Sequence, residues 1–234
     1  MIQKIYDSVV GSLQIMSNKE TNSNHFYPEK EERLNVLSHW YGFLCSAICF
    51  PFLIVKSVST GDPIYIFSLT IFGITLMLMF LTSTMYHRST DPTERNRYRM
   101  FDMFAIYTMI AGSYTPYALV LLKGERGWML FALIWGIALL GILWKSFTFG
   151  KYNLSSTFLY VAMGAICLFY LEDLIRLLPY DGLVWLIIGC TSYIVGVFFY
   201  LMDNRINYNH FIWHLFVIGG SFSHFISIFF YVLP

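Results

Sequence analysis

The chain has 234 residues, of which 57% are hydrophobic and only 12% are charged. A soluble domain has about 25% charged residues, so this composition indicates a membrane protein that crosses the bilayer several times. The net charge of +1 and the lack of a basic segment argue against binding of nucleic acid, and the four cysteines show no CxxC spacing for a zinc site.

The first 38 residues are predicted to form a cytoplasmic segment. Apolar residues recur at helical spacing through residues 1–16, which predicts a short amphipathic helix on the membrane or on the bundle. Residues 29–39 are charged and predict a helical lead-in to the first membrane span. The transmembrane domain is therefore expected to occupy residues 39–234.

Seven apolar runs are expected to cross the bilayer as helices, the first and the fifth of them short, and Gly, Pro and charged residues separate them. The expected spans are Trp40–Val55, Ile64–Tyr86, Met103–Leu122, Trp128–Trp144, Ser156–Leu171, Leu183–Met202 and Phe211–Val232. This pattern predicts an all-α protein, a bundle of seven transmembrane helices. Pro116 lies inside the third span and is expected to kink it.

The positive charges predict how the bundle sits in the membrane. Most of the 15 lysines and arginines lie at the N-terminus and in the loops after the second, fourth and sixth spans. Because cytoplasmic loops are enriched in Lys and Arg, we expect a cytoplasmic N-terminus, an outside C-terminus and a location in the plasma or inner membrane. At the outer face, Glu172 and Arg176 are four residues apart and predict an ion pair.

Histidines gather at the predicted cytoplasmic face. His210 and His214 open the last span four residues apart, so both project from one helix face and can reach one metal ion. His87 ends the second span at the same face, and three imidazoles with one water make a plausible zinc site. His39, at the start of the first span, is favoured as a supporting residue, and His224 as a packing residue nearer the middle of the bilayer.

Two further polar residues are candidates for the chemistry. Asp102 begins the third span at this face, and Ser83 lies one helical turn before His87. A carboxylate can accept the proton of a water that zinc has acidified. A hydroxyl can hold that water or stabilise an oxyanion.

Simpler interpretations of these two residues stay open. Asp102 could pair with Arg99 or Arg97, or cap the N-terminus of its helix. Ser83 could donate its hydrogen to a carbonyl of its own helix, as serines in membrane helices often do.

Four motifs occur in order and with compatible spacing. They are Glu31-Glu32-Arg33-Leu34-Asn35-Val36-Leu37-Ser38-His39, Ser83-Thr84-Met85-Tyr86-His87, Asp102 with Ile106-Tyr107 and Ala111-Gly112-Ser113-Tyr114-Thr115-Pro116, and His210-x3-His214 with His224. From about residue 29 to its end, the chain resembles the bacterial hemolysin III proteins. That family belongs with the progestin and adipoQ receptors and, more distantly, with the alkaline ceramidases. Ser38 and Ser113 stand where the family usually has Thr.

The resemblance implies zinc held at the cytoplasmic side by His87, His210 and His214, with Asp102 and Ser83 binding or activating the zinc water. The ceramidase relatives hydrolyse the amide of a sphingolipid. We therefore expect a zinc-dependent, membrane-embedded hydrolase of a lipid amide or ester, involved in membrane lipid homeostasis. Its expected partners are the bilayer and a membrane lipid substrate.

Two other functions stay open. The three imidazoles could bind a structural zinc ion that holds the bundle of a non-catalytic membrane sensor or regulator together. The family name suggests a cytolysin, although no span carries the regular polar stripe that would line a pore. The lipid substrate and the oligomeric state are left open.

Overall fold

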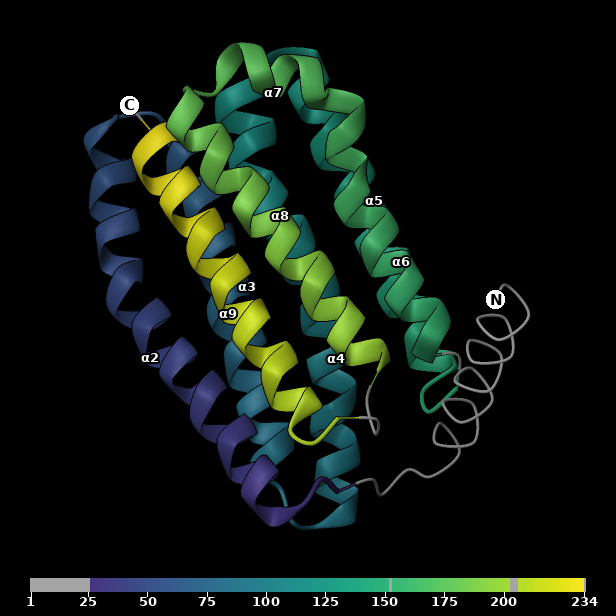
Figure 1. The fold of residues 1–234 in the computed structure, drawn as a ribbon. Helices are drawn as coiled ribbons and strands as arrows, with labels where there is room; N and C mark the ends of the chain where they lie inside the picture. The colour runs from purple at the N-terminus through teal and green to yellow at the C-terminus, as the bar shows by residue number, and fades with distance from the viewer. Residues whose placement is uncertain (1–25, 152, 203–205, 234) are drawn as a thin grey trace, which may run out of the picture.

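The computed structural model describes residues 26–151, 153–202 and 206–233, and every regular element within these ranges is helical (Figure 1). Seven helical segments in these ranges are long and apolar enough to cross a membrane. They are α2 (Glu29–Ser59), α3 (Pro63–Arg88), α4 (Pro92–Pro116) with η1 (Tyr117–Leu122), α5 (Gly124–Phe147), α6 (Asn153–Ala165) with η2 (Ile166–Tyr170) and α7 (Leu171–Leu177), α8 (Tyr180–Leu201), and α9 (Asn209–Ser227) with η3 (Ile228–Val232).

The predicted all-α, seven-helix membrane protein is therefore confirmed, while the orientation of its termini stays a prediction. The amphipathic helix expected over residues 1–16 lies outside the described residues. α2 begins at Glu29 and runs without a break past residue 38. Acidic side chains in its first turn favour this early start because they interact well with the helix dipole. The division of the chain at residue 38 stays a prediction.

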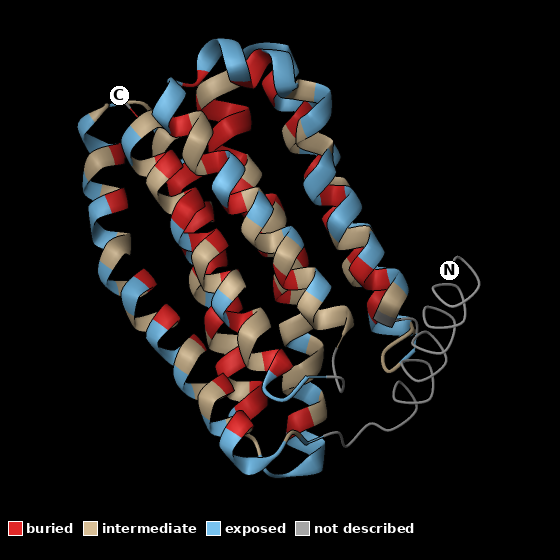
Figure 2. Cartoon of the chain, in the orientation of Figure 1, coloured by how far each residue is buried: buried red, intermediate tan, exposed pale blue. Residues whose placement is uncertain are grey.

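The helices pack as a bundle whose buried residues concentrate along its middle (Figure 2). α2 packs on α3 and α9, α3 packs on α4, and α8 packs on α9, while α5 lies against α4. The third span is the most deeply buried of the seven. A polar side chain on α3, α4 or α9 is consequently held within the bundle rather than exposed to lipid.

Two Asp-Pro pairs explain where α3 and α4 begin. The Asp62 carboxylate accepts a hydrogen bond from the amide of Ile64 at 2.8 Å. The Asp91 carboxylate accepts from the amide of Glu94 at 2.9 Å. In both helices a proline follows the cap, where its missing N–H costs nothing.

The third and seventh spans end in π-helical turns at the end of the bundle opposite to the start of α2, which we call the far end. The α-helical hydrogen bonding of α4 stops at Pro116, which has no N–H, and the chain continues as η1. The structure thus places an irregularity of the third span where the sequence predicts a kink. α9 likewise continues as η3, and the Lys56 ammonium donates to the carbonyl of Phe229 in that turn at 2.7 Å.

The fifth span is broken between α6 and α7 by the 3-10 turn η2. Tyr114, on α4, supplies the missing bonds there. Its hydroxyl donates to the carbonyl of Gly164 at 2.7 Å and accepts from the amide of Cys167 at 2.8 Å. Unpaired backbone groups cost several kcal/mol in hydrocarbon, so this one side chain makes the break tolerable.

The predicted ion pair between Glu172 and Arg176 is wrong, because Arg176 pairs with Asp173 instead. Arg176 binds Asp173 at 3.1 Å, three residues away rather than four. Arg126, on α5, binds the other oxygen of the same carboxylate at 2.8 Å. Asp173 faces the bundle with its side chain nearly buried, which puts it within reach of both arginines.

Candidate metal centre

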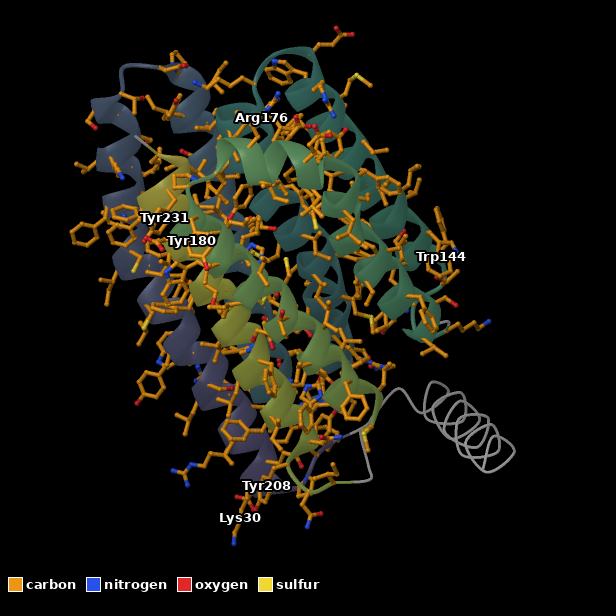
Figure 3. The ribbon with its side chains drawn as sticks, turned by 45° about the horizontal axis from the view of Figure 1, so that its top comes forward. Lys30, Trp144, Arg176, Tyr180, Tyr208 and Tyr231 are labelled. Carbon is orange, nitrogen blue, oxygen red and sulfur yellow. The ribbon has the colours of Figure 1, made fainter. Side chains whose placement is uncertain are left out.

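Three histidines meet at the end of the bundle where α2 and α9 begin. His87 comes from the last turn of α3, and His210 and His214 come from the first turns of α9. One ring nitrogen of each lies within 4.8 Å of the others, and all three side chains are buried. Figure 3 marks this end by Lys30, in the first turn of α2, and Tyr208, directly before α9. The charge distribution predicts that this end is cytoplasmic.

The turn into α9 fixes where its histidines begin. Tyr208 has a left-handed backbone, with φ of 62°, which is unusual for an aromatic residue. The side-chain amide of Asn209 donates to the carbonyl of Phe199 at the end of α8, at 2.8 Å. Because α9 starts in this fixed position, the His210 and His214 side chains project together toward α3.

Each imidazole is held at Nδ1 by an oxygen from one short stretch of the chain, residues 27–38. The three pairs are His87 with Glu32 Oε2 at 2.7 Å, His210 with the Tyr27 hydroxyl at 2.8 Å, and His214 with Ser38 Oγ at 3.2 Å. The Nε2 atoms point the other way, toward one another. His87 Nε2 and His210 Nε2 are 3.2 Å apart.

These hydrogen bonds assign the ring hydrogens of two histidines. An ionised Glu32 can only accept, so His87 Nδ1 carries the hydrogen and His87 Nε2 carries a lone pair. Ser38 donates its single hydrogen to the carbonyl of Asn35 at 2.9 Å, so it must accept from His214 Nδ1. His214 Nε2 has no partner among the described residues. Two lone pairs therefore face the middle of the group, which suits a bound cation.

Ser83 lies beside this group. It is one turn before His87 on α3, and its side chain is buried. Its hydroxyl has no hydrogen-bond partner among the described residues, so it does not bond its own helix. It faces the Asp102 carboxylate on α4, so the two groups can act on one water or ligand atom.

Asp102 is half-buried on α4 and lines the same cavity as His210. The Ser83 hydroxyl and the Arg99 guanidinium face its carboxylate. No ion pair of 4.0 Å or less joins Asp102 to Arg99 or Arg97, all of which are described residues, and Asp91 rather than Asp102 caps α4. The interpretation of Asp102 as a helix cap is therefore wrong, and the charge of Arg99 acts on Asp102 without a close ion pair.

The remaining described histidines lie outside the group of three. The His39 ring stacks on His214 with centroids 3.7 Å apart and meets the edge of Phe80 at 5.2 Å. His224 lies farther along α9, with its Nε2 4.0 Å from the Cys190 sulfur. His39 supports the ring of His214 from behind, whereas His224 packs in the middle of the bundle.

A cavity of about 440 Å³ reaches the group of three histidines at His210 and leads away from it. Tyr27, Asp102 and His210 line one end of it, and Leu122 and Leu174 line the other. Asp102 and Leu122 are twenty residues apart on one span, which corresponds to about 30 Å along a helix. The cavity is therefore long and has its polar groups at one end.

This cavity also opens sideways toward the membrane. Val161 on α6, Leu168 on η2 and Ile194 on α8 line it and are at the same time exposed on the outer surface, by 41%, 64% and 64%. A residue can do both only where the wall is thin or open. The opening thus lies between the fifth and sixth spans.

Comparison with known proteins identifies the family. The profile described as "Haemolysin-III related" matches residues 27–225. The chain belongs to the haemolysin-III related family. It is 36% identical to "Hemolysin-3" of Bacillus cereus over 219 residues, 94% of this chain and 99% of that protein. It is 38% identical to the "Hemolysin-3 homolog" of Bacillus subtilis (strain 168) over 202 residues, 86% of this chain and 94% of the relative.

A more distant relative is human. The chain is 30% identical to the "Monocyte to macrophage differentiation factor" of Homo sapiens over 167 residues, 69% of each protein. The haemolysin-III match begins at Tyr27, the residue whose hydroxyl holds His210. The family region thus includes the stretch that holds the imidazoles as well as the imidazoles themselves.

Sequence reasoning gave no role to the groups that hold the histidines. Glu32 was placed in a charged lead-in and in the first motif without a role of its own, yet it bridges His87 and the buried Arg95. Arg95 in turn donates to the carbonyl of Tyr86 at 3.1 Å. The available signal was the spacing of Glu32 and His39, seven residues apart and so on one face of a helix.

Proposed function

We propose that this haemolysin-III related protein is a zinc-dependent, membrane-embedded hydrolase that acts on a lipid amide or ester in membrane lipid homeostasis. One observation carries the proposal. Three buried imidazoles converge, and one of them, His210, lines the polar end of a long apolar cavity that opens toward the lipid. An apolar pocket with a few polar groups at one end is typical of a ligand site, and ionisable side chains within a membrane usually have a function.

The donor set fits zinc. Zinc–nitrogen bonds are 2.0–2.1 Å long, so two nitrogens of a zinc tetrahedron are about 3.3 Å apart. The Nε2 atoms of His87 and His210 are 3.2 Å apart. His214 Nε2, without a partner among the described residues, completes the set of three protein ligands that is typical of catalytic zinc. When bound, zinc supplies an acidified water and a Lewis acid for a carbonyl.

Asp102 and Ser83 act on the water and on the lipid carbonyl. Asp102 accepts the proton of the attacking water at a carboxylate oxygen and later returns it to the leaving nitrogen or oxygen. Ser83 donates its unpaired hydroxyl hydrogen to the oxyanion that forms on the carbonyl, or holds the water before attack. Asp102 lines the cavity from α4, Ser83 faces Asp102 from α3, and the imidazoles of α9 lie opposite.

The cavity binds the apolar part of the lipid. Its volume of about 440 Å³ falls in the range of small-molecule pockets. An acyl chain entering between Val161 and Ile194 would lie along the bundle with its carbonyl at the polar end. Apolar walls exclude bulk water, which strengthens the electrostatic interactions at that end.

Metal content of the detergent-purified protein tests the proposal first. Elemental analysis should find about one zinc ion per chain in the wild type and none in His214→Ala. His224→Ala is the matched control, because it removes a buried imidazole from the same helix outside the group of three. Wild-type protein that is folded, prepared without chelator and free of metal would refute the hydrolase.

A structural zinc ion in a membrane sensor is the second candidate, because ligands from α3 and α9 would tie two spans together. His87→Ala separates the two. A folded but inactive variant supports catalysis, whereas an unfolded or strongly destabilised one supports the structural role. The name of the Bacillus cereus relative points to a cytolysin, but a cavity lined largely by apolar residues does not suit a water-filled pore.

A further inference from the structure

Residues 26–38 hold the candidate metal centre from one side, and we call Phe26–Ser38 the clamp. All three Nδ1 partners belong to it. The Tyr27 ring also stacks on His210, with centroids 4.5 Å apart, and lies 6.0 Å from the His87 ring. The clamp therefore both orients the imidazoles and covers part of the centre.

Arg95 on α4 fastens the clamp to the rest of the bundle. Its guanidinium pairs with Glu32 and lies 4.2 Å from the centroid of the Phe26 ring. Within the clamp, the amide of Tyr27 donates to Glu32 Oε1 at 3.1 Å. One buried cation thus holds the clamp in the position from which it contacts the histidines.

We propose that the clamp determines how tightly and for how long the centre holds its metal ion. A hydrogen bond from Nδ1–H to an oxygen fixes the ring and increases the donor strength of Nε2. Three Nδ1–oxygen contacts come from one segment, and His210 Nδ1 carries the hydrogen when its Nε2 binds the metal. Displacing that segment would therefore loosen all three ligands together. Coupling of this kind is reciprocal, so metal binding must also hold the clamp in place. The inference rests on the proposed metal, but not on hydrolysis.

The three contacts differ in how cleanly they can be tested. Glu32 makes the charged and therefore strongest bond, but its loss would also leave the buried Arg95 unpaired. Tyr27→Phe is cleaner, because the ring that stacks on His210 remains and only the hydroxyl is removed. Ser38→Ala removes the third contact, and Ser38→Thr should restore it because the hydroxyl is kept.

The first measurement is competition for zinc between the full-length protein in detergent and a chromophoric chelator. Tyr27→Phe and Ser38→Ala should each weaken zinc binding about 10–100-fold and speed its release, and Ser38→Thr should stay near the wild type. Tyr41→Phe is the matched control, since Tyr41 lies on α2, the helix of Ser38, and is 61% exposed on its outer surface.

The second measurement tests the reciprocal effect by hydrogen exchange of backbone amides. Removing zinc from the wild type should speed exchange in peptides covering residues 26–38. Peptides covering residues 46–59, the far half of α2, should exchange at an unchanged rate. This readout depends on neither substrate nor turnover.

The outcomes separate the clamp from the hydrolase. Wild-type zinc affinity in Tyr27→Phe and Ser38→Ala, with unchanged exchange, overturns the clamp and leaves the metal centre standing. If the variants bind zinc more weakly but the wild type cleaves no lipid amide or ester, the clamp is supported and the hydrolase is refuted. A wild type that binds no metal overturns both.

Discussion

The two ends of α9 carry similar polar side chains but opposite hydrogen-bond patterns. At the far end, Ser227 accepts from the Tyr117 hydroxyl at 2.8 Å and donates to the carbonyl of Gly182 at 2.9 Å. At the near end, His214 Nε2 has no partner among the described residues, and neither does the Ser83 hydroxyl on the facing helix α3. We call the far end closed, because Ser227 both accepts and donates a hydrogen bond there, and the near end open, because it has unpaired polar atoms.

The two hydrogen-bond patterns suit different tasks, stability at the far end of α9 and ligand binding at the near end. A buried polar group without a partner costs about 1–3 kcal/mol, so a closed network stabilises the bundle and an open one weakens it. Asn35 and His39 add further unpaired side-chain atoms at the near end. Ser68 and His224 also carry unpaired atoms elsewhere, but those of the near end lie around the three histidines, where a site can gain free energy when its ligand binds.

Of the substitutions at the open end, Asp102→Asn should have the largest effect on turnover. Loss of the proton acceptor should lower turnover about 100-fold or more, while the metal content stays near that of the wild type. Turnover on a lipid substrate and elemental analysis check this together. Asp173→Asn, at the closed end, is the control and should keep full turnover. Wild-type turnover in Asp102→Asn would remove Asp102 from the chemistry.

Ser83→Ala should lower turnover about 100-fold, as removal of one oxyanion donor does in other enzymes. The stability should hardly change, because the hydroxyl has no partner to lose. Ser68→Ala is a close control. Ser68 is buried on the same helix and is also unpaired among the described residues, but lies about 22 Å from Ser83 along α3. Equal turnover in the two variants would show that Ser83 has no part in catalysis.

Ser227→Ala should show the reverse pattern at the closed end. The change leaves the Tyr117 hydroxyl and the Gly182 carbonyl without their partner, which should destabilise the bundle by about 1–3 kcal/mol. Turnover per folded molecule and zinc content should be unchanged. Reversible unfolding in mixed micelles measures the first effect, and an unaltered unfolding curve would contradict the assignment of this network as stabilising.

Arg176→Ala should have the smallest effect. Its pair with Asp173 is exposed on the arginine side and Arg126 still binds the same carboxylate. Exposed pairs contribute about 0–1 kcal/mol, so the unfolding free energy should fall by less than about 1 kcal/mol, and less still in high salt. A loss as large as that of Ser227→Ala would show that the far end depends on charge rather than on its closed hydrogen bonds.

The seven spans and the convergence of three histidines follow from local patterns. Apolar runs fix the number of helices because a bilayer demands a minimum length. The spacing of His210 and His214 fixes a shared helix face, and His87 ends a span at the same end of the bundle. These features need no knowledge of how the helices pack.

The clamp could not be predicted in the same way. Glu32 is 55 residues from His87 and 63 from Arg95, so no local pattern links them. Its neighbours are charged, which is typical of a solvated helix start. The π-helical turns η1 and η3 also lack a distinct sequence pattern beyond Pro116, because packing at the end of the bundle decides their hydrogen bonding.

The bond network of Tyr114 has a consequence for biogenesis. The fifth span has a break in its backbone ladder where the Tyr114 hydroxyl of the third span supplies hydrogen bonds, besides one from the Cys167 thiol to the Gly164 carbonyl. Insertion of the fifth span alone would leave the amide of Cys167 without this partner in the hydrocarbon, which is unfavourable in free energy. Tyr114 precedes Gly164 by 50 residues, so its span leaves the ribosome first. The order of synthesis thus delivers the partner before the segment that requires it.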